Sequence, residues 1–219
     1  MKILVTGGAG FIGSHLVEEL LSNENEILIF DNCLTGKKEN LDIKGNFKFI
    51  NDDFGSENSL EEIERFNPDI CFHLAAQSSV VVSVENPALD FEHNILQPIK
   101  LIQVLLKSNC NKFVFTSSGG TIFGEPTTIP TAEEDYADEP ESPYGVAKKR
   151  LNELIKIMTK SSNLKYSILN LSNVYGPRQD PYGEAGVVSI FAKKYLNNEE
   201  PTVYGDGEQT RDYIYVKDV

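Results

Sequence analysis

A glycine-rich turn near the start of the chain limits most strongly what this sequence can fold into. Residues 3–5 form a short apolar run that predicts a buried strand. Four glycines follow it: Gly7, Gly8, Gly10 and Gly13. Behind them apolar residues recur at helical spacing as far as Leu21, so the glycines occupy a turn from strand to helix. The free N–H groups of such a helix bind the pyrophosphate of a dinucleotide, and glycine lets the phosphates approach the backbone.

An acidic residue at the end of the next predicted strand supports the same interpretation. That strand covers residues 26–30. Asp31 follows it, about twenty residues after the glycines, where a carboxylate accepts hydrogen bonds from the adenosine ribose. A carboxylate there repels a 2′-phosphate, so the sequence favours NAD over NADP. Lys37 and Lys38 lie in a polar loop a few residues later and are expected to be solvated.

The rest of the chain alternates between predicted strands and helices. Further strands are predicted over residues 47–50, 70–76, 112–118 and 165–171. Helices are predicted from a Ser59/Glu62 capping box to Phe66, over 87–108, from Ser142 onward, and over 187–195. This alternation predicts an α/β fold with a doubly wound, mostly parallel, Rossmann-like sheet. A long irregular loop is expected over 125–143, and extended segments over 202–207 and 211–216.

The overall charge and the cysteine pattern exclude several kinds of partner. The 219 residues carry a formal net charge of −13, whose field repels nucleic acid and anionic membranes, so we expect neither as a partner. We find no stretch long enough to cross a membrane and no signal peptide. Cys33, Cys71 and Cys110 have no paired spacing, which favours reduced thiols in a cytoplasmic protein, and we expect no metal site.

Three residues form a candidate catalytic group. Ser118 ends the strand predicted over residues 112–118, and Tyr144 and Lys148 share one face of the following helix. A free tyrosine has a pKa near ~10, and a neighbouring ammonium favours its ionised form. Tyr144 can therefore act as a general base on a substrate hydroxyl that Ser118 also hydrogen-bonds, beside a hydride acceptor. Lys149 is rotated away from this face and is expected to be solvated.

These motifs occur in an order that resembles a known family. The sequence contains, in succession, TGGAGFIG, HLAAQ, SSGG at a strand end, SPYGVAK, NVYGPRQDP and YGDGEQTRDY. This set resembles the extended short-chain dehydrogenase/reductase family, and is most similar to its NAD-dependent sugar-nucleotide epimerases of the UDP-glucose 4-epimerase type. The resemblance covers nearly the whole chain. Phe123 stands where many relatives have tyrosine, and Asn170 where arginine is frequent, but neither change removes a catalytic group.

The resemblance implies a role for each of several residues. Tyr144 would be the base, Lys148 would bind the nicotinamide ribose, and Ser118 would support the transferred proton. NAD would contact Gly7, Gly10, Phe11, Ile12, Gly13, Asp31, Asn32, Asp53, Leu74, Ala75, Ala76, Gln77, Tyr144 and Lys148. A UDP-sugar substrate would contact Ser118, Tyr144, Asn173, Val188, Tyr204 and Arg211. The guanidinium of Arg211 suits a diphosphate, which it can bind with two hydrogen bonds.

The resemblance also implies two domains. Residues 1–170 would form the NAD-binding Rossmann domain, and residues 171–219 the start of a small nucleotide-sugar-binding domain. Because chains of the family continue well beyond the RDYI segment, we expect this second domain to be incomplete and the chain to be truncated. The apolar helix over 87–108 and the helix that carries Tyr144 are also expected to pair across a two-fold axis, which predicts a homodimer with a four-helix interface.

The activity that the resemblance implies is epimerisation of a nucleotide sugar by reversible hydride transfer at carbon 4, of the UDP-glucose/UDP-galactose type. The alternatives are a nucleotide-sugar 4,6-dehydratase or decarboxylase of the same family, or a dinucleotide-sensing protein without catalysis. The family's dehydratases carry an Asp-Glu pair after the hydroxyl residue of the fifth strand, and its decarboxylases carry a glutamate there. Here Ser118 is followed by Gly119, Gly120 and Thr121, which favours the epimerase. The presence of the whole catalytic group, Ser118, Tyr144 and Lys148, disfavours a dinucleotide-sensing protein without catalysis.

Overall fold

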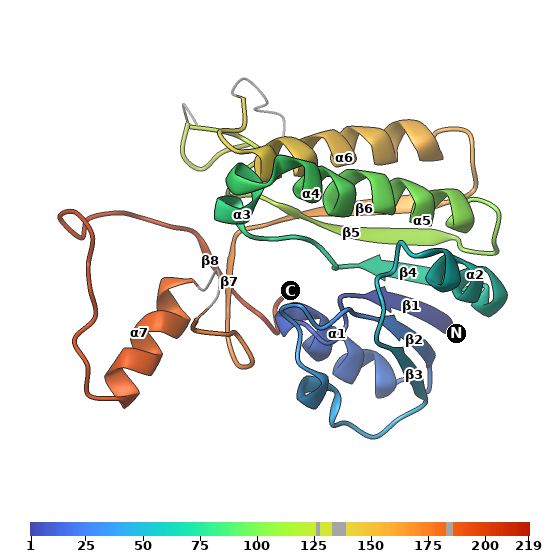
Figure 1. Cartoon of the computed structure of the whole chain (residues 1–219), viewed down its shortest axis with the longest axis horizontal. Helices are drawn as coiled ribbons and strands as arrows, with labels where there is room; N and C mark the ends of the chain where they lie inside the picture. The colour runs from blue at the N-terminus through green and yellow to red at the C-terminus, as the bar shows by residue number, and fades with distance from the viewer. Residues whose placement is uncertain (126–127, 133–138, 183–185) are drawn as a thin grey trace.

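A six-stranded sheet forms the centre of the computed structural model, which describes residues 1–125, 128–132, 139–182 and 186–219 (Figure 1). Its strands are β1 (Lys2–Thr6), β2 (Glu26–Phe30), β3 (Phe47–Ile50), β4 (Ile70–His73), β5 (Lys112–Ser118) and β6 (Lys165–Leu171). They lie in the order β3-β2-β1-β4-β5-β6, and all neighbours are parallel. The order reverses between β1 and β4, and ligands of such sheets bind at the carboxyl ends of the strands beside that reversal.

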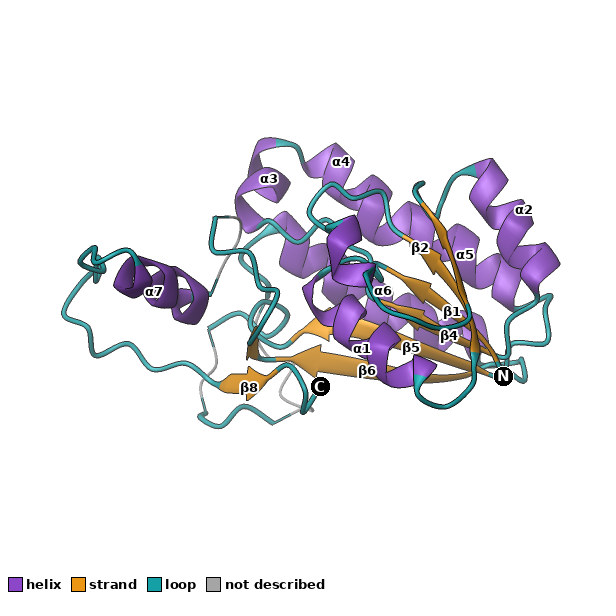
Figure 2. Cartoon of the chain, turned by 90° about the horizontal axis from the view of Figure 1, so that it is seen from below, coloured by secondary structure: helices purple, strands orange, loops and turns teal. Residues whose placement is uncertain are grey.

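Helices cover both faces of this sheet, so the predicted doubly wound fold is confirmed (Figures 1 and 2). One face carries α2 (Glu57–Phe66), α4 (Pro87–Phe91), the π turn η2 (Glu92–Leu96), α5 (Gln97–Leu105) and α6 (Pro143–Thr159). The other face carries α1 (Phe11–Leu21) and the 3₁₀ turn η1 (Lys38–Leu41). The short helix α3 (Val80–Glu85) precedes α4.

The alternation of side chains along the strands divides the core between the two faces. Leu4 of β1 packs with the α2, α5 and α6 side, whereas its neighbours Ile3 and Val5 pack against α1. On β5, Phe113 and Phe115 also belong to the α5 and α6 side. Because β1 is buried on both faces, it has the continuous apolar run typical of a parallel sheet rather than an alternating pattern.

The C-terminal part of the chain builds a smaller sheet outside the main one. β7 (Asn173–Tyr175) pairs in parallel with β8 (Tyr213–Tyr215). The helix α7 (Val187–Leu196) has no buried residue and lies apart from the main sheet in Figure 1. Among the helices of the described ranges, none is long and apolar enough to span a membrane.

Several predicted boundaries are wrong. The capping residue of α2 is Ser56 rather than Ser59, because the Ser56 hydroxyl accepts a hydrogen bond from the Ser59 N–H at 3.1 Å. β4 ends at His73 rather than at residue 76, because the next two N–H groups converge on one acceptor, the Thr6 carbonyl.

The predicted helix over 87–108 forms, but the π turn η2 interrupts it and it ends at Leu105. No strand forms over 202–207, while the extended segment expected over 211–216 contains β8. Helix α3 was absent from the sequence prediction. Parts of the loop expected over 125–143, namely 126–127 and 133–138, lie outside the described residues.

Candidate active site

The backbone of the glycine turn between β1 and α1 packs directly against the backbone of neighbouring residues. Gly7 has a φ of +75°, and a Cβ on it would lie only 2.6 Å from the Ala75 nitrogen. A Cβ on Gly13 would collide with the Gly7 carbonyl oxygen. The turn therefore lies directly against the loop that follows β4.

The first turn of α1 fits an anionic group. Its N-cap is Gly10, no side chain caps it, and the turn contains no acidic residue. Phe11 and Ile12 begin the helix, so their N–H groups lie among the first donors of a helix, which have no partner within it. A Cβ on Gly10 would occupy the approach to this end, where its nearest neighbour is the Gly7 carbonyl at 3.1 Å. The pyrophosphate of a dinucleotide is the kind of anion that such a cradle binds.

Asp31 lies at the end of β2 next to this turn and is 9% exposed. One carboxylate oxygen accepts the Ala9 N–H at 3.0 Å, and the other accepts the Cys33 N–H at 2.8 Å. These bonds fix the carboxylate beside the glycine turn, and each oxygen keeps a lone pair for a ribose hydroxyl. Asn32 follows in the chain and accepts the Leu34 N–H.

The two lysines after Asp31, Lys37 and Lys38, are exposed, as predicted. The ammonium of Lys37 also pairs with the Asp180 carboxylate at 3.0 Å. Nearby, Arg178 pairs with Glu18 of α1 at 2.8 Å. The two ion pairs tie the segment after β7 to the half of the sheet that carries the glycine turn.

Asp53 lies in the loop that leaves β3, as predicted, whereas Leu74, Ala75 and Ala76 lie in the loop that leaves β4 and not in the strand where they were expected. Asp53 accepts the Gly55 N–H, and its second carboxylate oxygen lies 3.4 Å from His93 Nδ1. The side-chain amide of Gln77 donates to the Asp90 carboxylate at 2.7 Å.

Tyr144 and Lys148 are brought together in the buried first turns of α6. Ser142 caps this helix by accepting the Gly145 N–H at 3.1 Å, as predicted. The Lys148 ammonium lies 5.8 Å from the centre of the Tyr144 ring and donates to the Thr116 carbonyl of β5 at 3.2 Å. Burial lowers the pKa of Lys148 to about 8, and the Asp90 carboxylate opposes that shift.

The prediction for Lys149 is wrong. This residue is only 7% exposed, so it is buried rather than solvated. The first turns of α6 bury successive side chains because the helix packs on the sheet along one side and on α3, α4 and η2 along another.

Ser118 ends β5 and is half-buried at the same edge of the sheet. Its carbonyl accepts the Thr121 and Ile122 N–H groups, both at 3.3 Å, which turns the chain back towards α6. A Cβ on Gly145 would lie 2.5 Å from the Thr121 carbonyl oxygen, so this glycine allows the loop to touch the first turn of α6. The hydroxyl residue predicted at the strand end thus lies beside the helix that carries Tyr144.

The residues predicted to bind substrate are only partly brought together. Asn173 begins β7, and its side chain donates to the Asp212 carbonyl at 3.0 Å, next to Arg211. Arg211 is exposed and donates to the Thr210 carbonyl. Val188 lies on α7 and Tyr204 in the loop that follows it, with exposed fractions of 37% and 84%. The pairing of β7 with β8 therefore brings Asn173 and Arg211 together, while Val188 and Tyr204 lie apart from them.

Sequence reasoning missed two buried polar residues near this site, Asp90 and Asn94. Asp90 is 0% exposed and Asn94 is 2% exposed. The signal that was available is a pair of polar side chains at a spacing of four within a largely apolar helix.

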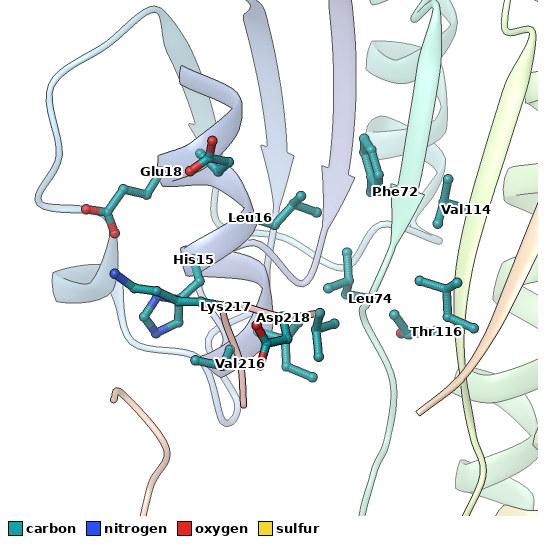
Figure 3. Close-up of a pocket in the computed structure, with 14 residues that line it drawn as sticks. His15, Leu16, Glu18, Phe72, Leu74, Val114, Thr116, Val216, Lys217 and Asp218 are labelled. Atoms are coloured by element: carbon teal, nitrogen blue, oxygen red, sulfur yellow. The ribbon is translucent and has the colours of Figure 1, made fainter. Parts of the chain in front are cut away.

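A cavity of about 440 Å³ lies on the α1 side of the sheet (Figure 3). Its lining includes His15 and Leu16 of α1, Phe72 of β4, and Val114 and Thr116 of β5. Residues 216–219 form another wall. Because side chains alternate along β5, this cavity opens on the face opposite Phe115 and Lys148, and neither Tyr144 nor Lys148 lines it. It shares Ile12 and Leu74 with the residues predicted to bind NAD.

Comparison with known proteins places these features in a family. Residues 3–219 match the sequence model of the NAD dependent epimerase/dehydratase family. The chain is 40% identical over 222 residues to the UDP-glucose 4-epimerase of Mycolicibacterium smegmatis, and the match covers 100% of this chain and 71% of that protein.

Two solved structures are similar over the same length. The UDP-glucose 4-epimerase of Thermotoga maritima with UDP-glucose has a TM-score of 0.94 and 45% identity, covering 100% of this chain and 70% of that one. The UDP-glucose 4-epimerase of Thermus thermophilus in complex with NAD has a TM-score of 0.90 and 44% identity, covering 100% of this chain and 71% of that one.

Proposed function

The chain belongs to the NAD-dependent epimerase/dehydratase family, and from that premise we propose that it interconverts UDP-glucose and UDP-galactose, or their N-acetyl forms, by epimerisation at carbon 4. The observation that carries this proposal is the buried pair of Tyr144 and Lys148 beside the carboxyl end of β5. A phenol and an ammonium held there, next to a dinucleotide cradle, form an acid/base group at a hydride-transfer site.

Each member of the group has a separate task. NAD, when bound, would supply the hydride acceptor for carbon 4 of the sugar and the hydride donor for the opposite face of that carbon. Tyr144 takes the proton of the 4-hydroxyl and later gives it back. Lys148 favours the ionised phenol by its positive charge. Ser118 hydrogen-bonds the same hydroxyl and orients it towards the phenol.

The cofactor is proposed to lie along the carboxyl edge of the sheet. Its pyrophosphate would bind the first N–H groups of α1, at Phe11 and Ile12, where Gly7, Gly10 and Gly13 let it approach the backbone. Asp31 accepts the adenosine ribose hydroxyls, with Asn32 and Asp53 near the adenine. Leu74, Ala75, Ala76 and Gln77 line the far half of the site.

The nucleotide sugar is proposed to bind between this edge and the C-terminal segment. Asn173 and Arg211 supply an amide and a guanidinium for the diphosphate, and the β7–β8 pairing supports that assignment. Val188 and Tyr204 are proposed to join them from residues 171–219. On this division, residues 1–170 form the NAD-binding domain and residues 171–219 belong to the substrate-binding domain.

The residues after Ser118 favour epimerisation over dehydration. Elimination across carbons 5 and 6 needs further acid/base groups near the sugar. Gly119, Gly120 and Thr121 cannot transfer those protons at neutral pH. An epimerase needs one base and room for the keto sugar to rotate, which small residues provide.

A homodimer in the cytoplasm completes the proposal. Apolar side chains are exposed on the layer formed by α4, η2 and α6, with exposed fractions of 40% for Leu89, 50% for Leu96 and 69% for Ile157. A second copy of the same helices would cover them as a four-helix interface. The free thiols Cys33, Cys71 and Cys110 support a reducing compartment.

The test is an activity assay with UDP-glucose and UDP-galactose. We expect interconversion of the two sugars with NAD retained between turnovers. Tyr144→Phe removes the acid/base oxygen and should reduce the rate by about 10²-fold or more while NAD stays bound. Tyr166→Phe, on the exposed start of β6, is the matched control and should keep the parent rate.

Two outcomes would contradict the proposal. A 4-keto-6-deoxy sugar that accumulates from any nucleotide sugar would identify a dehydratase. A near-normal rate in Tyr144→Phe would mean that the base lies elsewhere.

A further inference from the structure

The chain makes a tight turn over residues 176–179, directly after β7. The Gln179 N–H donates to the Gly176 carbonyl at 3.4 Å, and the Gln179 side-chain amide donates to the Val174 carbonyl at 3.1 Å. A Cβ on Gly176 would lie only 2.6 Å from a methyl carbon of Val216, the residue that follows β8. The turn is therefore fixed on the small β7–β8 sheet, in the segment where the nucleotide sugar is proposed to bind.

An arginine occupies the most restricted position of this turn. Pro177 stands second and Arg178 third, and Arg178 has a φ of +69°, which is the pattern of a type II turn. Glycine or asparagine is usual at that third position, because most side chains are strained there. Such strain persists where the surrounding structure holds it, and it is found mostly at functional sites. The contacts of the Arg178 guanidinium are therefore expected to explain why glycine does not stand there.

The turn reaches α1 through two contacts. Arg178 Nη2 lies 2.8 Å from Glu18 Oε2, and the Pro177 carbonyl lies 3.0 Å from His15 Nε2. His15 and Glu18 are three residues apart and share one face of α1. The His15 ring also makes an edge contact with the Phe11 ring, with centres 6.2 Å apart. The face of α1 that the turn contacts therefore continues to the first turn of the helix, where the pyrophosphate of NAD is proposed to bind.

A third contact reaches the glycine turn itself. Asp180 Oδ2 lies 3.0 Å from Lys37 Nζ. The Lys37 N–H donates to the Ala9 carbonyl at 3.0 Å, and Ala9 precedes Gly10, the N-cap of α1. Residues 177–180 thus hold both the side of α1 and the glycine turn at its N-terminal end, next to the proposed pyrophosphate site.

We propose that residues 177–180, here named the clasp, retain the cofactor: the clasp ties the sugar-binding segment to the pyrophosphate site, and NAD leaves only after the clasp has opened. The inference rests on the proposed function, since it concerns the cofactor assigned there. The clasp residues transfer neither proton nor hydride. They set how long NAD stays bound, which matters to an enzyme in which one NAD serves both hydride transfers of a turnover.

Each ion pair of the clasp is weak by itself, because its side chains are partly solvated. The exposed fractions are 57% and 37% for Lys37 and Asp180, and 25% and 54% for Arg178 and Glu18. A pair of this kind changes an equilibrium by a factor of about two to five. Both pairs extend from one hydrogen-bonded turn, so opening breaks them together, and we expect their factors to multiply to about tenfold.

The test measures the rate at which NAD leaves the whole chain. The NAD-loaded protein is mixed with an excess of etheno-NAD, a fluorescent analogue, and the exchange is followed with time. Glu18→Gln and Asp180→Asn each remove one ion pair, keep the size of the side chain, and should speed up release about twofold to fivefold. Asp180→Asn also keeps an acceptor for the Tyr182 N–H, which Asp180 accepts at 3.0 Å. The double variant should release NAD about tenfold faster than the parent.

Arg178→Gly separates cofactor retention from stability. Glycine relieves the strain at a φ of +69°, so a turn with a merely structural role would tolerate this change. The clasp instead predicts faster NAD release together with little change in the free energy of unfolding without cofactor. Glu62→Gln is the matched control, since it removes the same charge and breaks an ion pair with Lys48 on β3, and it should keep the parent release rate.

A charge exchange covers the case in which one of these variants does not fold. Glu18→Arg alone places two guanidinium groups together and should speed up release, whereas Glu18→Arg/Arg178→Glu restores the pair and should slow it again. Salt gives an independent readout: screening weakens exposed pairs, so release from the parent should accelerate with salt more steeply than release from Glu18→Gln/Asp180→Asn.

Two results would overturn the inference. One is an NAD release rate in Glu18→Gln, Asp180→Asn and Arg178→Gly equal to that of the parent, and the other is an equal acceleration in Glu62→Gln. A parent chain that retains NAD but does not interconvert UDP-glucose and UDP-galactose would contradict the proposed function alone. Because release is measured without any sugar, the two failures are distinguishable.

Discussion

Asp31 is the single residue with the clearest expected effect on cofactor choice. Asp31→Asn keeps the size of the side chain but removes the charge that binds ribose hydroxyls and repels a 2′-phosphate. We expect NAD affinity to fall about tenfold, since hydrogen bonds to a charged group contribute about 1.5–3 kcal/mol. NADP affinity should fall less, so the preference for NAD over NADP should become smaller. Titration calorimetry with both cofactors measures this.

Two further variants make the Asp31 experiment decisive. Asp42→Asn, at an exposed position after η1, is the control and should bind NAD as the parent does. Asp31→Ala also removes the acceptor of the Ala9 and Cys33 N–H groups, so it should lose stability as well as affinity. NAD affinity equal to that of the parent in Asp31→Asn would refute the role of the carboxylate.

His73 is expected to make the fold sensitive to acid. Burial lowers its pKa to about 3, so the native state does not take up the proton that the unfolded state binds below about pH 6.5. The free energy of unfolding should therefore fall as pH drops from 6.5 towards 3, by at most about 1.4 kcal/mol per pH unit from this group. Urea unfolding at pH 6.5 and 5 should show a loss of about 2 kcal/mol from His73.

The His73 variant is compared with the parent protein by how much the free energy of unfolding changes with pH, not by its absolute value. His73→Asn leaves a polar atom near Thr6, whose hydroxyl lies 2.6 Å from His73 Nδ1, but removes the titration. The stability difference between the two pH values should shrink in this variant. An unchanged slope in His73→Asn would contradict the assignment.

At the residue scale, the sequence identified those functional residues whose roles follow from residues nearby in the chain. Helical spacing alone places Tyr144 and Lys148 together. The position of Asp31 directly after a strand indicates its role. Asp90 could not be found this way, because an aspartate in a helix is usually solvated and its partner Gln77 is 13 residues away in the chain. Lys149 was misplaced for the same reason, since its burial depends on helices packed against α6.

At the scale of the element, the N-cap of α6 positions the proposed base. Ser142→Ala removes the acceptor for the Gly145 N–H and should reduce stability by about 1 kcal/mol. Because Tyr144 lies in that first turn, kcat should fall as well. Ser56→Ala removes the matching cap of α2, far from the base in sequence, and should reduce stability similarly without lowering kcat. Chemical unfolding and steady-state kinetics on both variants check this.

One result would contradict that argument about the cap. If Ser142→Ala lost stability while its kcat stayed at the parent value, the first turn of α6 would hold Tyr144 without its cap. Ser142→Asp, which restores an acceptor at the N-terminus, should recover most of both quantities.

The elements themselves were largely predictable, because five of the six main strands match their predicted ranges closely. Apolar runs and turn residues are local signals. The errors concern choices between local alternatives: Ser56 and Ser59 can both cap a helix, and only the fold makes Ser56 the acceptor. The π turn η2 did have a local signal, since Pro98 follows it and has no N–H to donate to the Asn94 carbonyl four residues earlier.

At the scale of the whole molecule, the order of the strands follows from alternation and right-handed crossovers, so the topology was predictable. The placement of residues 171–219 was not. Its contacts with the rest of the chain include two ion pairs, Lys37 with Asp180 and Arg178 of this segment with Glu18 of α1, that join residues far apart in the chain. Charge pairs of this kind have many possible partners in a sequence with 33 acidic residues.

The proposed homodimer is the prediction that belongs to the whole molecule. Leu96 is 50% exposed on the helix layer that would face a second copy, and Leu196 is 79% exposed on α7, away from it. A buried charge without a partner is strongly unfavourable in an apolar interface, so Leu96→Glu should raise the dimer dissociation constant by at least about 10²-fold. Leu196→Glu is the matched control and should leave the dimer intact. Sedimentation equilibrium across micromolar concentrations measures both, and a parent protein that is monomeric throughout that range would refute the dimer.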